Sequence, residues 1–449
     1  MPILNVSGYR GIWGTDLNEQ IAYEFGIAFA QFIKNHGGHK ILVGRDARKT
    51  GEAIFGALQS AFQNEGLEIE YAGIIPTPSM LFLIRKLGFD GGVMITASHN
   101  PPEYNGLKFI NSSGLFATQK EIEEITKNKE KLPAQVSPIP GIGENVETDN
   151  SKFRKLHIDE ILKNIDVDLI KNKKFKVALD PINSAGSIIT QELLKELSCE
   201  VYAINTEQNG EFAHEPEPLP KNLGQIGKAV LDSKSDVGFA QDPDADRLVI
   251  VNEKGEVLNE EYTLALSVKS VLSKNPGDIV INMSTSRINE DIAKQYGGKT
   301  YYSKVGEANV VEMIQTTNSI MGGEGGGGVI YPRINTARDS LVGIALTLEL
   351  MANENKLISE IADSLPKYFM KKDKLTFSGD LNNFYEKLKI TFRDATLNTL
   401  DGVRFDWADS SWIHIRPSNT EPIVRIIGEA KDENRINSLF DQVRLTLNS

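Results

Sequence analysis

Strand and helix signals alternate along most of the chain, and this alternation limits the folds that the chain can adopt. Residues 18–35 carry apolar side chains at helical spacing and end before two glycines, and residues 40–45 follow as a short apolar strand. The same order returns in residues 52–64 and 68–72. Alternating strands and helices are typical of parallel strand–helix–strand units. The sequence therefore predicts layered α/β domains.

The strand–helix order recurs twice more along the chain. Apolar strands at residues 41–44, 177–179 and 279–282 are each followed by a helical pattern, a similarity of architecture and not of residue identity. We expect three similar layered α/β domains with mixed sheets and a smaller α+β C-terminal domain, arranged around a central cleft. Residues 133–150, a polar stretch with prolines and glycines, are predicted to form the first linker. The predicted domain limits are 1–148, 149–252, 253–366 and 367–449.

Composition excludes several classes of protein. The 61 acidic residues outnumber the 49 Lys and Arg residues and give a formal net charge of −12, which argues against nucleic acid or an anionic membrane as a partner. The one cysteine, Cys199, excludes an intramolecular disulfide. The sequence shows neither a secretory signal nor an apolar run of the ~20 residues that span a bilayer. We expect a cytoplasmic protein, either a monomer or a homodimer.

A serine closes one of the predicted strands. Residues 92–95 form an apolar run, Ser98 follows it, and two prolines and residues 104–106 complete a predicted tight loop. Open α/β sheets bind ligands at the carboxyl ends of their strands. There a hydroxyl can carry a phosphoryl group if a cation and hydrogen-bond donors surround it, although a turn serine that caps a backbone N–H is the alternative. His99, next to Ser98, is a further candidate catalytic residue.

Three carboxylates occupy alternate positions between two apolar runs. Asp242, Asp244 and Asp246 offer oxygen ligands on a short arc, and such ligands suit a hard divalent cation, above all Mg²⁺. An oxygen of the substrate or of phosphorylated Ser98 would complete the set of ligands. Clustered carboxylates are often only a solvated turn, but here flanking strands would hold the three at fixed spacing.

A third loop lies near the C-terminus, between two predicted antiparallel strands. It combines a guanidinium, two hydroxyls and an amide, which together are typical of a phosphate clamp. Its candidate phosphate-binding residues are Arg416, Ser418, Asn419, Thr420 and the following Arg425.

Six glycines surround a single acid in residues 322–328. Glycines let the backbone approach a ligand closely, and the carboxylate of Glu324 can accept hydrogen bonds from two adjacent sugar hydroxyls. Gly323, Glu324 and Gly325 are therefore candidate sugar contacts, although a glycine run alone could be a flexible loop.

Taken in order, these four loops resemble those of the α-D-phosphohexomutase superfamily. The serine loop is similar over residues 96–101, the metal loop over 242–247, the sugar loop over 323–328 and the phosphate loop over 416–422. The resemblance covers nearly the whole chain. It implies an intramolecular phosphotransferase, an isomerase, in which phosphorylated Ser98 donates to a phosphosugar and then takes back the other phosphate of the bisphosphosugar intermediate. It also implies Mg²⁺ as the metal and a hexose 1,6-bisphosphate as the activator.

The resemblance assigns roles to cations outside these loops. It implies that Arg10 reaches the active site, that Lys108 assists proton transfer, and that Arg247 steadies the phosphoserine oxygens. Strand alternation sends Lys108 to the face opposite its neighbours. A surface arginine and a solvated strand lysine are the alternatives for the first two. Arg287 is a further candidate phosphate contact.

The chain departs from the family pattern at two positions. Gly328 stands where many members have a histidine, and Glu307 stands where others have His or Asp, so Glu307 is a candidate sugar contact. In the family these positions help to recognise the sugar and to move protons, so the resemblance determines the reaction type more closely than the substrate. The form of the sugar loop favours a phosphoglucosamine mutase, with a phosphomannomutase or phosphoglucomutase as the alternative. A sugar-phosphate phosphatase or a non-catalytic sensor is less favoured, because Ser98 and the three aspartates are intact.

Overall fold

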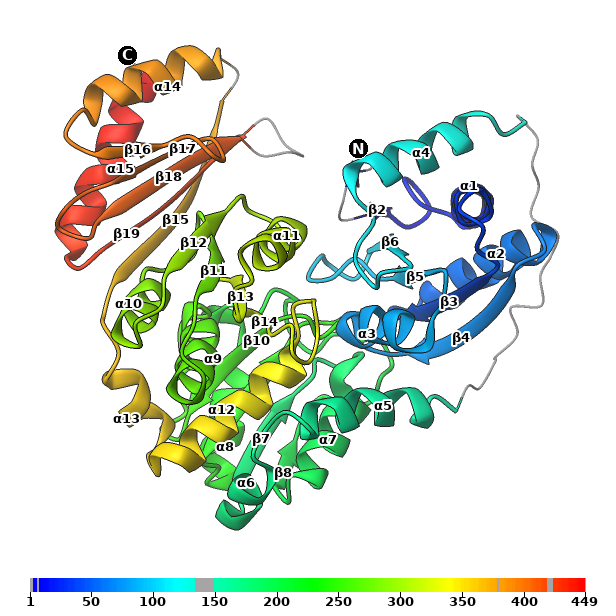
Figure 1. The fold of residues 1–449 in the computed structure, drawn as a ribbon, viewed down its shortest axis with the longest axis horizontal. Coiled ribbons are helices and arrows are strands. Elements are labelled where there is room, and N and C mark those ends of the chain that lie inside the picture. Colours follow the sequence, from blue (N-terminus) through cyan, green and yellow to red (C-terminus); the bar gives the residue numbers. More distant parts are fainter. Residues whose placement is uncertain (1–2, 6–7, 134–148, 378, 418–422, 449) are drawn as a thin grey trace. The chain divides into compact units, whose positions relative to one another are not determined.

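The computed structural model describes residues 3–5, 8–133, 149–377, 379–417 and 423–448 (Figure 1). These residues divide into two compact units, Met1–Thr263 with Gly327–Ser359, and Leu264–Gly326 with Glu360–Ser449, and each unit is described by itself. The predicted linker lies almost entirely outside the described residues. The domain limits expected from the sequence therefore stay a prediction.

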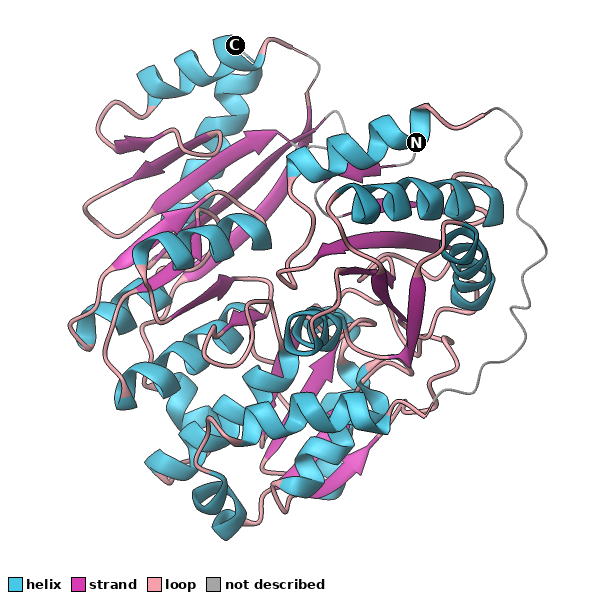
Figure 2. Cartoon of the chain, turned by 45° about the vertical axis from the view of Figure 1, so that its right-hand side comes forward, coloured by secondary structure: helices cyan, strands magenta, loops and turns pink. Residues whose placement is uncertain are grey.

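The first unit begins with a mixed sheet whose strands alternate with helices (Figures 1 and 2). Its elements are β1 (Ile3–Asn5), β2 (Gly8–Ile12), α1 (Glu19–Asn35), β3 (Lys40–Arg45), α2 (Gly51–Asn64), β4 (Glu68–Ile74), α3 (Thr77–Leu87), β5 (Gly91–Ile95), β6 (Tyr104–Asn111) and α4 (Gln119–Glu130). Strands β3, β4 and β5 are parallel, whereas β6 runs antiparallel to β5 and β2. The described strands lie in the order β1-β2-β6-β5-β3-β4.

Each face of this sheet is covered by its own apolar cluster. Helices α1, α2 and α4 supply the cluster on one face, and α3 supplies the cluster on the other. Helix α1 begins where the side chain of Asn18 accepts a hydrogen bond from the Ile21 N–H at 2.9 Å. Its Phe25 and Phe29 rings lie 5.9 and 5.2 Å from the Phe109 ring of β6. These contacts hold the strand that carries Lys108 against the helix layer.

The predicted serine loop is shorter than expected, because residues 104–106 begin β6. These residues pair with β2 on one side, where Arg10 faces Gly106 and Gly11 faces Asn105. A Cβ atom at Gly106 would lie 2.5 Å from the Tyr9 carbonyl oxygen and 2.9 Å from that of Thr96. The residue signals of a turn are thus overridden by backbone pairing, and the glycine allows strands to approach on both sides.

The second sheet of this unit places the three aspartates. Its elements are α5 (Ser151–Leu162), α6 (Val167–Lys173), β7 (Lys176–Asp180), α7 (Gly186–Glu196), β8 (Glu200–Ala203), η1 (Pro220–Asn222), α8 (Gly224–Ser233), β9 (Val237–Gln241) and β10 (Leu248–Asn252). Strands β8, β7 and β9 are parallel, and β10 returns antiparallel to β9. Gln241 and Leu248 are partners at the end of this pair, so residues 242–247 form the loop between them.

A later segment of the chain returns to the first unit. Strand β14 (Gly328–Ile330) leads to α12 (Ser340–Glu354), which contacts α5, α6 and β10. Residues 340–352 of this helix are buried all round, as its apolar composition predicts.

The second unit contains the third α/β layer. Its elements are α9 (Glu261–Lys274), β11 (Ile279–Asn282), α10 (Ile288–Gln295), β12 (Thr300–Ser303), α11 (Glu307–Thr317) and β13 (Met321–Glu324). Strand β11 pairs in parallel with both β12 and β13. The glycine run therefore begins within a buried strand, and Glu324 stands at the carboxyl end of that strand.

An antiparallel sheet covered by helices completes the second unit. Its elements are α13 (Ile358–Asp363), β15 (Phe369–Thr376), α14 (Leu381–Thr391), β16 (Thr396–Asn398), β17 (Val403–Asp406), β18 (Trp412–Pro417), β19 (Ile423–Ala430) and α15 (Glu433–Asn448). The described strands lie in the order β15-β19-β18-β17-β16. The fold class, three α/β domains with mixed sheets and a smaller α+β C-terminal domain, is confirmed. Among the described residues, no helix has the length and apolarity needed to cross a membrane.

Candidate active site

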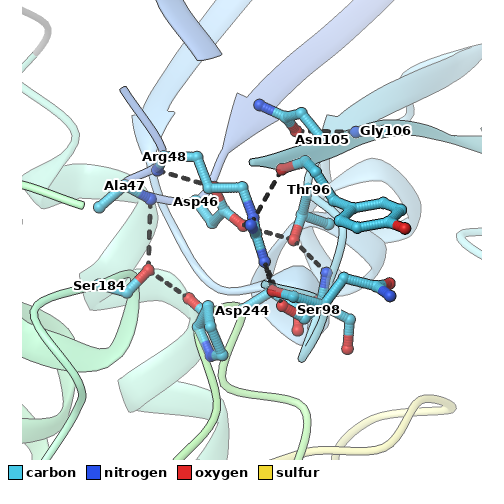
Figure 3. Close-up of polar contacts among 12 residues, drawn as sticks. Asp46, Ala47, Arg48, Thr96, Ser98, Asn105, Gly106, Ser184 and Asp244 are labelled. Atoms are coloured by element: carbon cyan, nitrogen blue, oxygen red, sulfur yellow. Dashed lines mark hydrogen bonds and ion pairs between the residues drawn. The ribbon is translucent and has the colours of Figure 1, made fainter. Parts of the chain in front are cut away.

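Ser98 lies in the loop that follows β5, among polar contacts from several segments (Figure 3). Its φ angle is 51°, in the left-handed region, which costs a residue other than glycine about 1–2 kcal/mol. The hydroxyl of Thr96 accepts the Ser98 N–H at 2.9 Å and donates to Asp46 Oδ2 at 2.6 Å. Ser98 is buried, with 2% of its surface exposed. Contacts around the loop must therefore offset the cost of its backbone conformation.

Arg48 supplies most of those contacts. Its side chain is 1% exposed, and its Nε atom lies 3.1 Å from Asp46 Oδ2. The ring of Phe212 lies 4.9 Å from the guanidinium carbon and covers it. The guanidinium donates to backbone carbonyl oxygens along the serine loop, those of Ser98, Asn100, Pro101 and Tyr104, at 2.7, 2.6, 2.7 and 2.9 Å. The serine loop is thus fastened to the carboxyl end of β3.

The three aspartates lie together and meet the serine hydroxyl. One oxygen atom from each of Asp242, Asp244 and Asp246 lies within 4.8 Å of the others, and all three residues are buried. The Ser98 hydroxyl donates to Asp242 Oδ2 at 3.2 Å. The sequence predicted both loops separately, and the fold of the first unit joins them.

Hydroxyl groups from other segments anchor the aspartate loop. Ser184 Oγ donates to the Pro243 carbonyl oxygen at 2.6 Å and accepts the Ala47 N–H at 3.3 Å (Figure 3). Thr77 Oγ1 donates to Asp244 Oδ2 at 2.6 Å. Ser340 Oγ donates to the Ala245 carbonyl oxygen at 2.6 Å. These contacts fix the loop from α3, from the segment just before α7 and from α12.

The three carboxylates differ in their electrostatic surroundings. Burial, and then the charges of Asp246 and Asp244, raise the pKa of Asp242 well above its usual value. Burial also acts to raise the pKa of Asp244, but the charge and hydrogen bond of Lys108, and the Thr77 hydroxyl, outweigh it and lower that pKa. Lys108 Nζ lies 2.6 Å from Asp244 Oδ2 and is buried, so Lys108 is not a solvated strand lysine.

The aspartate loop fits a hard divalent cation. Among the described residues, Asp244 Oδ1 and Asp246 Oδ1 are buried without a hydrogen-bond partner. A buried carboxylate oxygen without a partner is costly, and a bound cation would remove that cost. The ligands on offer are oxygen atoms, which Mg²⁺ prefers.

His99 and two arginines border the serine. The Ser98 hydroxyl lies 3.3 Å from His99 Nδ1. The charge of Arg247, followed by burial and the charges of Arg10 and Arg338, lowers the pKa of His99 well below its usual value, which leaves the imidazole neutral. Arg10 Nη1 donates to Asn100 Oδ1 at 3.3 Å. Positive charge therefore gathers around the serine hydroxyl.

Several residues at this site carried no prediction. Asp46 and Arg48 follow the strand β3 directly, and charged residues after a buried strand could have been noticed. Thr77 lies in a Pro-Thr-Pro turn with no such signal. Arg338, whose Nη2 lies 2.6 Å from Asp246 Oδ2, comes from the segment after β14, far along the chain from the aspartates.

The second unit gathers the predicted sugar contacts. Glu324 Oε1 accepts hydrogen bonds from Asn282 Nδ2 and from the Gly306 N–H, each at 2.9 Å. The Gly325 N–H donates to Thr285 Oγ1 at 3.1 Å. Gly323 and Gly325 are buried on either side of Glu324, and Glu307 follows Gly306 at the start of α11. The glycine run is thus a structured turn, not a flexible loop.

The predicted phosphate clamp is described in part. Arg416 on β18 faces Arg425 on β19, and Ser418, Asn419 and Thr420 lie outside the described residues. Burial lowers the pKa of Arg416, and the charges of Asp401 and Glu324 oppose that effect. Arg416 and Glu324 are therefore close enough to interact electrostatically.

Arg287, a predicted phosphate contact, is surrounded by carboxylates. Its Nη2 lies 2.8 Å from Asp406 Oδ1, its Nε lies 3.2 Å from Glu290 Oε2, and its N–H donates to Glu429 at 2.9 Å. The structure thus pairs Arg287 with carboxylates of α10 and of the C-terminal sheet.

The third α/β layer and the C-terminal sheet are joined by polar contacts within the second unit. Arg404 Nη1 donates to the Met283 carbonyl oxygen at 2.6 Å, and the Val305 N–H donates to Asp401 Oδ2 at 2.9 Å. The Ser284 hydroxyl and His414 Nδ1 lie 2.8 Å apart. These contacts hold the sugar-loop residues and Arg416 in one body.

Comparison with known proteins extends these observations. The four sequence profiles of phosphoglucomutase/phosphomannomutase match residues 1–135, 155–255 and 259–369, for alpha/beta/alpha domains I, II and III, and residues 371–446, for the C-terminal domain. The phosphoglucomutase/phosphomannomutase of Thermococcus kodakarensis is 35% identical over 95% of this chain and 94% of its own. The phosphoglucosamine mutase of Methanococcus vannielii is 35% identical over 98% of this chain and 97% of its own.

A solved structure agrees with these relatives. A phosphoglucomutase/phosphomannomutase family protein from Burkholderia thailandensis is 25% identical, has a TM-score of 0.84, and covers 98% of this chain and 96% of its own. Fold and matches together define a sugar-phosphate mutase. The chain belongs to the phosphoglucomutase/phosphomannomutase family, and the predicted resemblance to the α-D-phosphohexomutases is confirmed. By family the chain is a phosphohexomutase, an isomerase that acts on small phosphosugars.

Proposed function

We propose that this protein interconverts glucosamine 6-phosphate and glucosamine 1-phosphate through a phosphoserine at Ser98. The observation that carries the proposal is the Ser98 hydroxyl, which donates to Asp242 Oδ2 at 3.2 Å within a buried cluster of carboxylates and cations. The choice of glucosamine phosphate is supported by relatives named as phosphoglucosamine mutases in Methanococcus vannielii and Methanocaldococcus jannaschii. Mannose and glucose phosphates are the competing substrates, since the Thermococcus kodakarensis relative carries those names.

The metal proposed for this site is Mg²⁺, held by Asp242, Asp244, Asp246 and an oxygen of Ser98. When bound, it offsets negative charge on the phosphoryl group during transfer. The buried Oδ1 atoms of Asp244 and Asp246, which have no hydrogen-bond partner among the described residues, support this assignment.

The other residues around Ser98 have separate roles in the proposed reaction. When the hydroxyl attacks phosphorus, it turns its proton from Asp242 Oδ2 to the neutral His99 Nδ1, 3.3 Å away, which accepts it. Arg247 steadies the phosphoryl oxygens. Lys108 and Arg10 bind the reacting sugar oxygen, and Lys108 Nζ supplies or removes its proton.

Residues of the second unit bind the rest of the substrate. Glu324 accepts hydrogen bonds from sugar hydroxyls, with the backbone of Gly323 and Gly325 close by and Glu307 beside it. The phosphate that does not react is bound by a cationic and hydroxyl-rich group, Arg416, Ser418, Asn419, Thr420 and Arg425. The carboxylate partners of Arg287 support a role in holding the C-terminal sheet, and direct phosphate contact by this residue stays a prediction.

The reaction balances without an external acceptor. Phosphoserine passes its phosphoryl group to the free hydroxyl of the monophosphate and gives a 1,6-bisphosphosugar. The intermediate turns around and returns its other phosphoryl group to Ser98 Oγ, so the isomer leaves and phosphoserine is restored. A hexose 1,6-bisphosphate supplies the first phosphoryl group and leaves as a monophosphate. A cytoplasmic location and a monomeric or homodimeric state stay predictions.

A coupled assay tests this proposal. The purified protein is phosphorylated with glucose 1,6-bisphosphate and given glucosamine, mannose or glucose 6-phosphate, with formation of each 1-phosphate and release of inorganic phosphate measured together. The highest kcat/KM is expected for glucosamine 6-phosphate. Inorganic phosphate should be released far more slowly than the 1-phosphate forms. Release of phosphate in step with substrate loss would show a phosphatase instead.

A further inference from the structure

Position 328 and Arg338 compete for the same space. Gly328 begins β14, and a Cβ atom built on it would lie 2.4 Å from Arg338 Cδ and 2.9 Å from Arg338 Cγ. The third closest atom is Arg338 Cβ, at 3.4 Å. Carbon atoms do not approach to 2.4 Å without bonding, so any side chain at position 328 would have to displace the stem of Arg338. The arginine thus fills the space beside β14 that a side chain at this position would take.

The backbone next to Arg338 is held firmly in place. The Asp339 N–H donates to the Val329 carbonyl oxygen at 2.8 Å, which fastens this segment to β14. The Asp339 carboxylate accepts from the N–H groups of Leu341 and Val342 and so caps α12. His157 Nε2 lies 2.9 Å from Asp339 Oδ2, and both side chains are fully buried. The backbone that carries the Arg338 side chain is therefore held in a fixed position.

The guanidinium reaches the aspartate loop. Arg338 Nη2 donates to Asp246 Oδ2 at 2.6 Å, and Lys108 Nζ lies 3.8 Å from the same oxygen. Among the described residues, the other oxygen of this carboxylate, Asp246 Oδ1, is buried without a hydrogen-bond partner. A charged hydrogen bond to one carboxylate oxygen fixes the rotation of the group, and so fixes where the second oxygen points.

We propose that Arg338 is the positioning residue of the metal site, holding Asp246 so that its Oδ1 atom is presented to the cation. Gly328 is required because only the absence of a side chain leaves room for the arginine stem. The inference rests on the proposed function only in taking Asp246 as a metal ligand.

Metal binding in the unphosphorylated protein tests the inference without catalysis. Mn²⁺ affinity is measured by electron paramagnetic resonance for the wild type, R338A, G328A and the double variant R338A/G328A. R338A is expected to weaken Mn²⁺ binding by about 10–100-fold, as loss of a ligand's hydrogen-bond partner does. G328A is expected to do the same, because its methyl group displaces the arginine.

The double variant provides the decisive comparison. In the R338A background the closest arginine atom left is Cβ, at an ordinary 3.4 Å, so G328A should cause no further loss. An affinity for the double variant equal to that of R338A supports the inference. Wild-type affinity in either single variant, or two losses that multiply in the double variant, would overturn it.

Two more variants distinguish a wrong metal assignment from a wrong inference about Arg338. Arg333→Ala, an exposed arginine of the same segment, should bind Mn²⁺ like the wild type. Asp246→Asn should lose most of the affinity. If Asp246→Asn has no effect, the metal assignment of the proposed function fails and the inference fails with it. If only Asp246→Asn has an effect, the inference alone is wrong. Should R338A not fold, R338K replaces it, and an affinity equal to the wild type then counts against the inference.

Discussion

The Ser98 hydroxyl donates to Asp242 Oδ2 at 3.2 Å although 144 residues separate the two along the chain. Each lies in a loop that leaves the carboxyl end of a strand, Ser98 after β5 and Asp242 after β9. Ligand sites in α/β sheets form at such strand ends. In this protein two separate sheets bring their strand ends together, and the meeting point combines a nucleophile with a cluster of acids.

Replacing Ser98 with alanine should abolish isomerisation and leave the fold intact. The hydroxyl carries the phosphoryl group in the proposed reaction, and alanine has no oxygen to replace it. The measurements are mutase activity with glucosamine 6-phosphate, the mass of the protein after incubation with glucose 1,6-bisphosphate, and the melting temperature. Ser113→Ala, an exposed turn serine, is the control and should behave as wild type. Activity of Ser98→Ala within tenfold of the wild type would exclude the phosphoserine assignment.

Replacing Arg48 with lysine should lower kcat by about 100-fold, the scale expected when a reacting group is misplaced by about 1 Å. Lysine keeps the charge beside Asp46 but cannot reach the carbonyl oxygens of Ser98, Asn100, Pro101 and Tyr104 together. The KM for the sugar phosphate should stay within about threefold, because Arg48 does not touch the substrate in the proposed site.

A neighbouring arginine is the matched control for that prediction. Arg45 closes β3, and its guanidinium donates to the Tyr71 hydroxyl and Glu52 at 2.8 Å each and to the Asp46 carbonyl oxygen at 3.1 Å, in place of the serine-loop carbonyls that Arg48 binds. Arg45→Lys should leave both kcat and the yield of phosphoserine unchanged. Equal losses of kcat in the Arg45 and Arg48 variants would point to general destabilisation and not to positioning of Ser98.

Replacing Glu324 with glutamine should reduce kcat/KM for every hexose phosphate by roughly one to three orders of magnitude. The estimate comes from losing charged hydrogen bonds worth about 1.5–3 kcal/mol each. The amide oxygen of glutamine can still accept from Asn282 Nδ2 and the Gly306 N–H, so the local fold should survive. Mn²⁺ affinity and phosphorylation of Ser98 should not change.

The three quantities for Glu324→Gln are measured on one preparation, with Glu312→Gln, an exposed acid of α11, as the control. A fall in Ser98 phosphorylation as large as the fall in turnover would mean that Glu324 supports the serine loop. The assignment of residues 323–325 to the sugar would then be wrong.

Replacing Arg416 with alanine should raise the KM for the phosphosugar by about 10–100-fold and change kcat less. The proposed clamp binds the phosphate that does not react, so its energy is shared by ground and transition states. Arg393→Ala, an exposed arginine of the same sheet domain, is the control. An unchanged KM for Arg416→Ala would remove β18 from the substrate site.

Local sequence signals were sufficient for the fold class and for much of the chain order. Strand β3 and helix α1 were predicted nearly to the residue, because their apolar spacing and their flanking Asn18 and glycines are local features. Strand β15 and helix α14 were not predicted. Strand β15 is an edge strand rich in lysine, paired on one side with β19, and α14 buries little besides Phe384 and Leu388. Neither element has an apolar periodicity strong enough to predict it from the sequence.

The candidate site likewise contains some residues that the sequence indicates and others that only the structure shows. Ser98 and the three aspartates stand out in sequence because their loops occur together with the sugar and phosphate loops in one order along the chain, whereas either loop alone could be an ordinary turn. Arg48, Thr77 and Arg338 do not stand out, because each acts on a group in another segment, and no local pattern records which segment that is. Arg338 reaches Asp246 only because β14 and α12 carry the chain back to the first unit. The sequence therefore indicates reacting groups that lie within one recognisable loop. The residues that hold those groups in place come from other segments, and only the packing of the folded chain brings them there.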